Sequence, residues 1–353
     1  MVTHAKLSHD DAQIWRLPGE FEPQQALIMA WPHPDTDWAP ILEDIRQELA
    51  AIIQATLAHQ PVVLLVDPTD PHPLPESLGH APNLHVVALE FDDTWCRDYA
   101  PITLISKTQR CFLDFQFTGW GKYSAHLKDN SVTARLHQAP ELQSVLAAPH
   151  HTPCDLVLEG GAIECNGQGT LLVNWHCMRT RLPTWTMDDI TTALKKHLKV
   201  HQILGIDIPP LPGDDTDGHI DTLARFVDEK TLLVQTHPHD PTNDTLLAQL
   251  AALSIELPLA GSVKPRIVAL PCPPSELSLP KSYANFIMIN GAVLMPTYNL
   301  PTDDMARSVI KSALPDRDII GVAARALATQ AGGPHCTSMH IPQTDHARVR
   351  QDG

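Results

Sequence analysis

An internal repeat of about sixty residues constrains the fold of this chain more than any other feature of its sequence. Short apolar hairpins begin near Ile102, Ile163, Leu223 and Phe286. A unit of this size cannot bury its apolar face alone, so successive units must pack against one another. The repeat therefore predicts an α/β fold built from about five pseudo-symmetric units.

Polar residues with catalytic chemistry occupy the same place in the repeats, directly before each apolar hairpin or strand. They are Asp98, Glu159, His219, Asp221, Asn285 and Cys336. If the units surround an axis, these side chains meet at one end of it. A thiol, an imidazole and several carboxylates in one place favour a nucleophile that acts on a cationic substrate.

Local patterns predict how each unit is built. Apolar residues at helical spacing predict helices over residues 39–58, 186–198, 243–254 and 303–314. Continuous apolar runs predict buried strands over 26–31 and 61–66, and the segment 67–86 is predicted to be a loop. Turn signals separate the hairpin arms at Asn166-Gly167, Asp228–Lys230 and Asn290-Gly291.

No linker or charge run divides the chain. We therefore expect a single catalytic domain over residues 1–353, with peripheral tails at 1–20 and 343–353. The early unit, residues 21–66, is the most diverged of the repeats.

The composition argues against several classes of protein. The chain has 25 Lys and Arg against 41 Asp and Glu, a formal net charge of −16, which argues against nucleic acid as a partner and favours a small cation. Its seven cysteines form no C-x-x-C pair, which indicates reduced thiols. The N-terminus lacks the apolar core of a signal peptide, and no apolar run approaches the ~18 residues of a membrane span. We expect a cytoplasmic protein without a membrane partner, and a homo-oligomer is compatible with the sequence.

Cys336 is the candidate nucleophile. It lies in QAGGPHCTSMHIP, where two glycines and a proline predict a tight turn before a strand. A catalytic thiol needs a lowered pKa or a cationic substrate that stabilises the thiolate. The alternative is a buried structural cysteine, which is how we interpret the other six.

His219 and Asp221 form an H-x-D pair. Residues two apart in a strand face the same side, so the pair is predicted to project together from one strand end. A histidine there can transfer a proton near neutral pH. A metal site or a surface pair is the alternative, although H-x-D alone supplies too few ligands for a metal.

Asp98 follows Trp95 by three residues, which suits a planar cation because the carboxylate binds N–H groups and the ring offers a π face. An Asp–Arg surface pair is the alternative. Glu159 precedes a double glycine that lets the backbone turn behind the carboxylate. Asn285 is a candidate for holding a turn, and Trp120 for a pocket wall.

Together these patches resemble the agmatine deiminases and the Porphyromonas-type peptidylarginine deiminases of the guanidine-modifying superfamily. The resemblance spans residues 21–342 and is carried by FEPQQALIMAWP, TWCRDYAP, FTGWGKY, LEGGAIE, TDGHIDTLARF, SYANF and GGPHCTS. It implies a five-bladed, pseudo-symmetric α/β propeller (pentein-like) with a central active site, and a reaction without a metal or an organic cofactor.

The resemblance also implies a role for each residue. Asp98 and Asp221 bind the guanidinium group, and Cys336 attacks its central carbon to give a thiouronium intermediate. His219, supported by Glu159, protonates the leaving ammonia and later activates water. Other positions that contact the substrate are Trp95, Asn285 and Trp120. The implied reaction converts agmatine and water to N-carbamoylputrescine and ammonia.

Two segments depart from the family pattern. They are residues 330–340, which read AGGPH before Cys336 and TSMH after it, and residues 174–183, which lack an Asn-rich stretch. We expect both to line the pocket beyond the guanidinium. The alternatives are a deiminase of arginine, peptidyl-arginine or another guanidino compound, an amidinotransferase, and a non-catalytic propeller that binds a partner.

Overall fold

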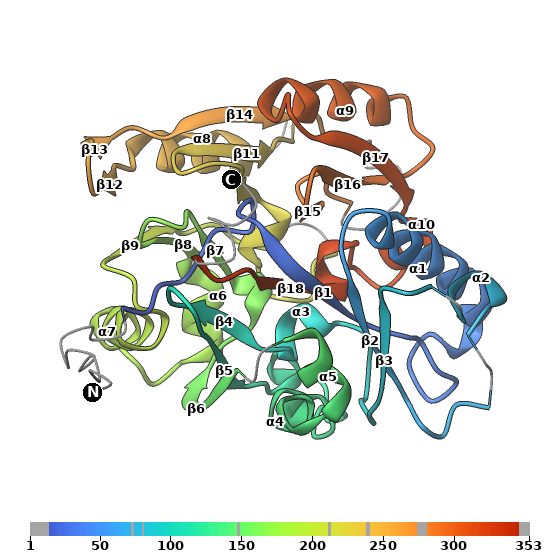
Figure 1. Cartoon of the computed structure of the whole chain (residues 1–353). Helices are drawn as coiled ribbons and strands as arrows, with labels where there is room; N and C mark the ends of the chain where they lie inside the picture. The colour runs from blue at the N-terminus through green and yellow to red at the C-terminus, as the bar shows by residue number, and fades with distance from the viewer. Residues whose placement is uncertain are drawn as a thin grey trace, which may run out of the picture.

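The computed structural model describes residues 14–71, 74–79, 81–146, 149–210, 213–237, 241–273 and 281–345. Within these ranges the chain has an α/β fold with five sheets of three or four strands, which follow one another in chain order around the molecule (Figure 1). Four of them are β4 (Ile102–Ile105), β5 (Arg110–Gln116) and β6 (His150–Val157); β7 (Ile163–Cys165), β8 (Thr170–Asn174) and β9 (Gln202–Ile206); β10 (Ala224–Phe226), β11 (Thr231–Gln235) and β14 (Arg266–Leu270); and β15 (Ile287–Ile289), β16 (Ala292–Thr297) and β17 (Asp318–Ala323). The fifth consists of β18 (Ser338–Pro342), β1 (Gln24–Ala30), β2 (Val62–Val66) and β3 (Leu84–Ala88). A separate small sheet pairs β12 (Ile255–Leu257) with β13 (Gly261–Val263).

Each of the first four sheets repeats one pattern, an antiparallel hairpin followed by a parallel third strand. In one of them β7 is antiparallel to β8, and β8 is parallel to β9. The hairpin turn Asn166-Gly167 was predicted from sequence, and Gly167 adopts a positive φ of 70° there. Gly291 has a φ of 73° in the corresponding turn of another hairpin. The predicted hairpins are therefore confirmed.

The fifth sheet obtains its antiparallel partner from the opposite end of the chain. β1 pairs antiparallel with β18, with Gln24 opposite Pro342, and parallel with β2. The hairpin of this unit is thus split between the two ends of the chain. This split is why residues 21–66 look the most diverged in sequence.

Helices connect the strands. They are α1 (Leu42–Leu57), α2 (Glu76–Gly79), α3 (Cys96–Tyr99), α4 (Val132–Gln138), α5 (Pro140–Val145), α6 (Trp175–Arg181), α7 (Met187–Leu198), α8 (Pro241–Ala252), α9 (Thr302–Ala313) and α10 (Arg325–Ala328). The four predicted helices correspond to α1, α7, α8 and α9 and are confirmed. Helix α7 begins with a capping box in which Thr186 and Asp189 satisfy each other's backbone N–H groups. The loop predicted over residues 67–86 is wrong in part, because it contains α2 and the start of β3.

A short helical turn comes directly before one strand in each of four sheets. The turns are α3 before β4, η4 (Gly160–Ala162) before β7, η5 (Ile220–Thr222) before β10 and η6 (His335–Thr337) before β18. Asp98, Glu159, His219, Asp221 and Cys336 lie in or beside these turns, and Asn285 lies two residues before β15. The repeated architecture therefore delivers them to the same end of each sheet.

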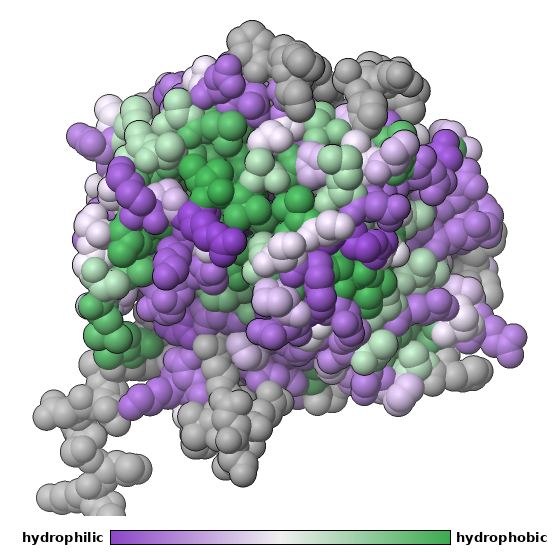
Figure 2. Space-filling view, turned by 90° about the horizontal axis from the view of Figure 1, so that it is seen from above, coloured by the Kyte–Doolittle hydropathy of each residue, from purple (hydrophilic) through white to green (hydrophobic). Residues whose placement is uncertain are grey.

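The interior is apolar and the surface is mixed. The central strands β2 and β8 bury nearly every residue, as expected for strands with a neighbour on each edge. On the face shown in Figure 2, hydrophilic residues cover most of the surface, and hydrophobic residues gather toward the middle and left. Within the described ranges, no helix has the length and apolar character needed to cross a bilayer.

Candidate active site

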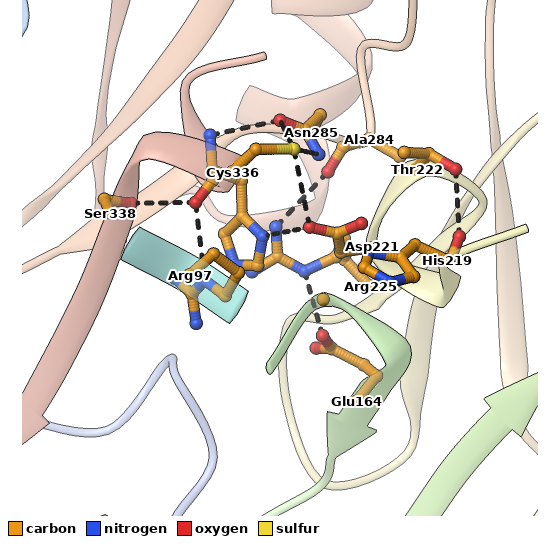
Figure 3. A network of polar contacts seen from close by, with 12 residues as sticks. Arg97, Glu164, His219, Asp221, Thr222, Arg225, Ala284, Asn285, Cys336 and Ser338 are labelled. Carbon is orange, nitrogen blue, oxygen red and sulfur yellow. Dashed lines mark hydrogen bonds and ion pairs between the residues drawn. The ribbon is translucent and has the colours of Figure 1, made fainter. Parts of the chain in front are cut away.

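Cys336 lies in the turn η6, where its sulfur reaches two polar side chains. Asn285 Nδ2 donates to the Sγ atom at 3.3 Å, and Asp221 Oδ2 lies 4.0 Å from it (Figure 3). The two glycines before the turn are required by close packing. A Cβ atom on Gly332 would collide with the Trp95 ring, and one on Gly333 would collide with the Asn285 side chain.

The surroundings of Cys336 favour the neutral thiol. Burial raises the pKa of Cys336 well above its usual value, and the carboxylates of Asp221 and Asp98 raise it further. A cation bound beside these carboxylates would reverse the electrostatic effect. The thiol is therefore placed to ionise when a cation arrives rather than before.

His219 is held by two carboxylates. Its Nε2 atom lies 3.1 Å from Glu159 Oε2, and its Nδ1 atom lies 3.8 Å from Asp98 Oδ2. Burial alone would lower the pKa of His219, but Asp98 and then Glu159 raise it to about 9. Burial would likewise raise the pKa of Glu159, yet His219 and Arg181 keep it below its usual value. The pair is thus an imidazolium and a carboxylate at neutral pH.

Asp98 and Asp221 have different surroundings. Asp98 accepts hydrogen bonds from the backbone N–H of Gly161 at 2.9 Å and from Trp120 Nε1 at 3.0 Å, and burial raises its pKa to about 6. Asp221 Oδ2 accepts from His335 Nδ1 at 2.7 Å, which overcomes the effect of burial and lowers the pKa of Asp221. Its Oδ1 atom is buried without a hydrogen-bond partner among the described residues. That oxygen is an unused acceptor beside the thiol.

A pocket of about 450 Å³ opens onto Cys336 and Asp98. Trp95, Trp120 and Tyr123 contribute aromatic walls. Its aspartates are Asp35, Asp37, Asp92, Asp93, Asp98, Asp129 and Asp215, and no Lys or Arg is found among the described residues that line it. Burial raises the pKa of Asp93 to about 7 and that of Asp129 well above its usual value, so these two carboxyl groups are the least ionised of the set. The other aspartates, with no basic residue among the described lining residues, favour a cation in the pocket.

A family model described as Porphyromonas-type peptidyl-arginine deiminase matches residues 16–342. The chain belongs to this family. It is similar to a cysteine-to-serine variant of the C. jejuni agmatine deiminase with substrate bound, with 28% identity, a TM-score of 0.83, and coverage of 96% of this chain and 99% of that one. A protein from Porphyromonas gingivalis, provisionally named an arginine deiminase, has 36% identity, a TM-score of 0.81, and coverage of 94% and 99%. A Marinomonas sp. (strain MWYL1) protein, provisionally named an agmatine deiminase, is 28% identical over 95% of this chain and 96% of its own.

This deiminase is accordingly a hydrolase that acts on C–N bonds. The structure brings together all the residues that sequence reasoning selected. They are Cys336, His219, Glu159, Asp98, Asp221, Asn285, Trp95 and Trp120. One local expectation is wrong, because His219 and Asp221 do not lie in a strand. The turn η5 places both beside the site before β10 begins.

Sequence reasoning missed a buried charged chain behind Asp221. His335 bridges Asp221 and Glu20 through its two ring nitrogens, each 2.7 Å from a carboxylate oxygen, and Arg225 Nη2 lies 2.9 Å from Glu20. Glu20 was expected in a peripheral tail, yet it is buried, which corrects the expected boundary at residue 20. The one available signal was His335 beside the candidate nucleophile.

The two divergent segments of this deiminase have different positions. From the segment 330–340, residues 330–332 and Cys336 line the pocket as expected, but none of the described residues over 174–183 does. That segment contains the whole of helix α6, and it contributes Arg181, whose Nε atom donates to Glu159 Oε1 at 2.6 Å. The expectation that 174–183 lines the pocket is therefore wrong.

One group of side chains has the spacing of a metal site. Ligand atoms of Glu159, Cys177 and His219 lie within 4.8 Å of one another, and all three residues are buried. The donor set does not fit a metal ion, because the Arg181 guanidinium already contacts Glu159. Burial and the neighbouring Glu159 also raise the pKa of the Cys177 thiol well above its usual value, so it is a poor ligand.

Proposed function

We propose that this protein is a guanidine deiminase that uses Cys336 as a covalent nucleophile, and that its substrate is agmatine. The observation that carries the proposal is the unused Oδ1 atom of Asp221, buried in a site whose thiol lies 4.0 Å from the other oxygen of the same carboxylate. A guanidinium group that donates to Asp221 would place its central carbon next to the sulfur. The five sheets then act as the blades of a pseudo-symmetric propeller, with this site at the centre of a single catalytic domain.

Binding of the guanidinium orients it for attack. Asp221 and Asp98 both lie close enough to Cys336 to raise the pKa of its thiol, and they supply charge-assisted acceptors for the guanidinium N–H groups. Trp95 and Trp120 supply the walls against which the planar group packs. Fixing the plane and position of a poor electrophile provides the proximity that the uncatalysed reaction lacks.

The chemical steps follow from the charges around each group. The bound cation lowers the cost of ionising Cys336, whose proton passes to solvent through the pocket, and the thiolate attacks the guanidinium carbon while Asn285 donates to the sulfur. His219, protonated at neutral pH, donates its proton to the departing nitrogen, which leaves as ammonia. The neutral imidazole then takes a proton from water as the water oxygen attacks the thiouronium carbon. Collapse of the adduct breaks the C–S bond and releases the ureido product, and the remaining hydroxyl proton restores the Cys336 thiol.

The outer pocket supports agmatine over arginine. Its rim carries Asp35, Asp37 and Asp215 and no basic side chain among the described lining residues. Agmatine has a positive charge at each end, so its ammonium group meets these carboxylates. Free arginine would place a carboxylate near them without a counter-ion, which is unfavourable in a partly desolvated site.

A substrate panel tests the proposal. The purified protein is incubated separately with agmatine, arginine, guanidinobutyrate, methylarginines and an arginine peptide, and ammonia and ureido product are measured. We expect kcat/KM for agmatine to exceed that for arginine by ~10²-fold or more. Equal or better turnover of arginine or the peptide would contradict agmatine as the substrate. Transfer of the amidino group to an added amine would indicate an amidinotransferase, and failure of every compound would favour a binding protein.

A further inference from the structure

Arg181 is buried at the end of α6 and makes three contacts with the site. Its Nε atom donates to Glu159 Oε1 at 2.6 Å, and its Nη1 atom donates to Asp217 Oδ2 at 2.6 Å. Its Nη2 atom donates to the backbone oxygen of Thr216 at 2.8 Å. The side chain is only 3% exposed, so water does not compete for these contacts.

The contact with Glu159 determines which carboxylate oxygen faces His219. Glu159 is fully buried and its oxygens are divided, with Oε1 on Arg181 and Oε2 on His219 at 3.1 Å. A carboxylate held at both oxygens cannot rotate away from the imidazole. Arg181 thereby fixes the orientation of the ring through a residue that it touches, without touching the ring itself.

The other two contacts extend to the pocket wall. Thr216 lines the pocket, and Asp217 adopts a positive φ of 62° next to it. This conformation is unfavourable for a residue other than glycine and persists only where neighbours hold it. Arg181 and Lys122 both contact the Asp217 carboxylate, with Lys122 Nζ 2.9 Å from Oδ1. The Arg181 guanidinium therefore links the Glu159–His219 pair to residues 216–217 at the pocket wall.

We propose that Arg181 is a positioning residue for His219, acting through Glu159. The inference rests on the proposed deiminase function, and it assigns a role in the reaction to a segment that does not line the pocket. This role explains why the arginine at the end of α6 is buried rather than exposed to solvent.

The charges around the pair indicate what loss of Arg181 would do. Glu159 faces His219, Arg181, the Cys177 thiol and the Asp98 carboxylate, whereas His219 faces Asp98, Glu159 and Asp221. Without Arg181, burial and the remaining carboxylate make the charged form of Glu159 less stable, so its pKa rises. If Glu159 takes up a proton, His219 loses an anionic partner, and the pKa of the imidazole falls from about 9.

The experiment compares three variants. Arg181→Met removes the charge, Arg181→Lys retains a cation, and Arg179→Met is a matched control on the same helix, since Arg179 is exposed and pairs with Asp207 on the surface. We expect Arg181→Met to lower kcat by ~10²-fold and to move the alkaline limb of the kcat/KM profile down by about one pH unit or more. Arg181→Lys should recover part of both effects, and Arg179→Met should change neither.

A second readout does not depend on the substrate. The imidazole Cε1–H resonance of His219, assigned by its loss in His219→Gln, is titrated in the wild-type protein and in Arg181→Lys and Arg181→Met. We expect a lower midpoint in Arg181→Met, with Arg181→Lys between it and the wild type. An unchanged midpoint in a folded Arg181 variant would overturn the inference, whatever the turnover. Inactivity of the wild-type protein on every guanidino compound, with a shifted midpoint, would overturn the proposed function alone.

Discussion

The inner and outer ends of the pocket both carry carboxylates, but in different surroundings. At and behind the inner end Asp98, Glu159 and Asp221 are buried, and of these three Asp98 lines the pocket itself. Their pKa values are driven apart, with that of Asp98 raised to about 6 and those of Glu159 and Asp221 lowered. At the rim Asp35 and Asp37 are exposed.

The comparison separates two functions of the same residue type. Buried carboxylates have fixed partners, so removing one leaves a neighbouring charge uncompensated. Exposed carboxylates act through a screened field, so removing one has a small effect. We therefore expect the inner end to determine the reaction and the rim to adjust which cation is preferred.

The largest expected effect is at the nucleophile. Cys336→Ala and Cys336→Ser should abolish turnover, because both side chains lack the sulfur that forms the thiouronium intermediate. Circular dichroism and thermal melting should show an intact fold, since Cys336 is only partly buried and packs against the core rather than within it. Cys272→Ala serves as the matched control at another partly buried thiol. Near wild-type activity in either Cys336 variant would refute the thiol mechanism.

The inner carboxylates should come next. Asp98→Asn and Asp221→Asn keep the shape of the side chain but remove the charge and an acceptor. We expect each to lower kcat/KM by at least ~10²-fold, about 2.7 kcal/mol of transition-state stabilisation. Steady-state kinetics on agmatine measure the effect. Losses of only a few fold in both variants would mean that these residues are structural.

The pH dependence of kcat/KM should report the same inner groups. Asp98 must be ionised to bind a cation, so activity should fall tenfold per unit as the pH drops below about 6. His219 must be protonated to release ammonia, so activity should fall as the pH rises above about 9. Initial rates at low agmatine concentration across pH 4.5–10.5 (roughly the range that brackets both groups) give the profile. An alkaline limb near the ordinary pKa of histidine, about 6.5, would show that Asp98 and Glu159 do not stabilise the protonated form of His219.

The rim should give the smallest effect. Asp37→Asn removes the charge of an exposed residue that lines the pocket and should raise KM for agmatine by ~2- to 5-fold with little change in kcat, as expected for a screened contact of up to ~1 kcal/mol. Butylguanidine, which lacks the second ammonium group, should be almost unaffected. Asp304→Asn, on the exposed start of α9 and outside the pocket, controls for the loss of charge. Equal effects on both substrates would remove the rim from substrate selection.

The repeated architecture was accessible from the sequence because each unit carries its own local signals. The hairpin turns, the capped helix after Thr186 and the polar residue before each hairpin are all encoded within a few residues. The six polar candidates followed from their shared place in the repeat, whereas Trp95 and Trp120 were selected from their neighbours in sequence and from the family resemblance. Sequence reasoning succeeded wherever the information is local and recurs.

The contacts that the sequence did not reveal join residues far apart in the chain. Arg181 reaches Glu159 across 22 positions, and His335 reaches Glu20 across 315. A buried ion pair and a surface ion pair consist of the same residue types. The sequence alone therefore does not show which charged residues pair with one another. The antiparallel partner of β1 was missed for the same reason, since it is supplied by β18 at the other end of the chain.

Intact-protein mass spectrometry tests the central claim most directly. The protein is mixed with agmatine, quenched in acid during turnover, and digested to locate any modification. We expect a covalent adduct with the mass of agmatine less ammonia, confined to Cys336 and absent from Cys336→Ala. Turnover of agmatine without an adduct at Cys336, or with one on another cysteine, would contradict the account.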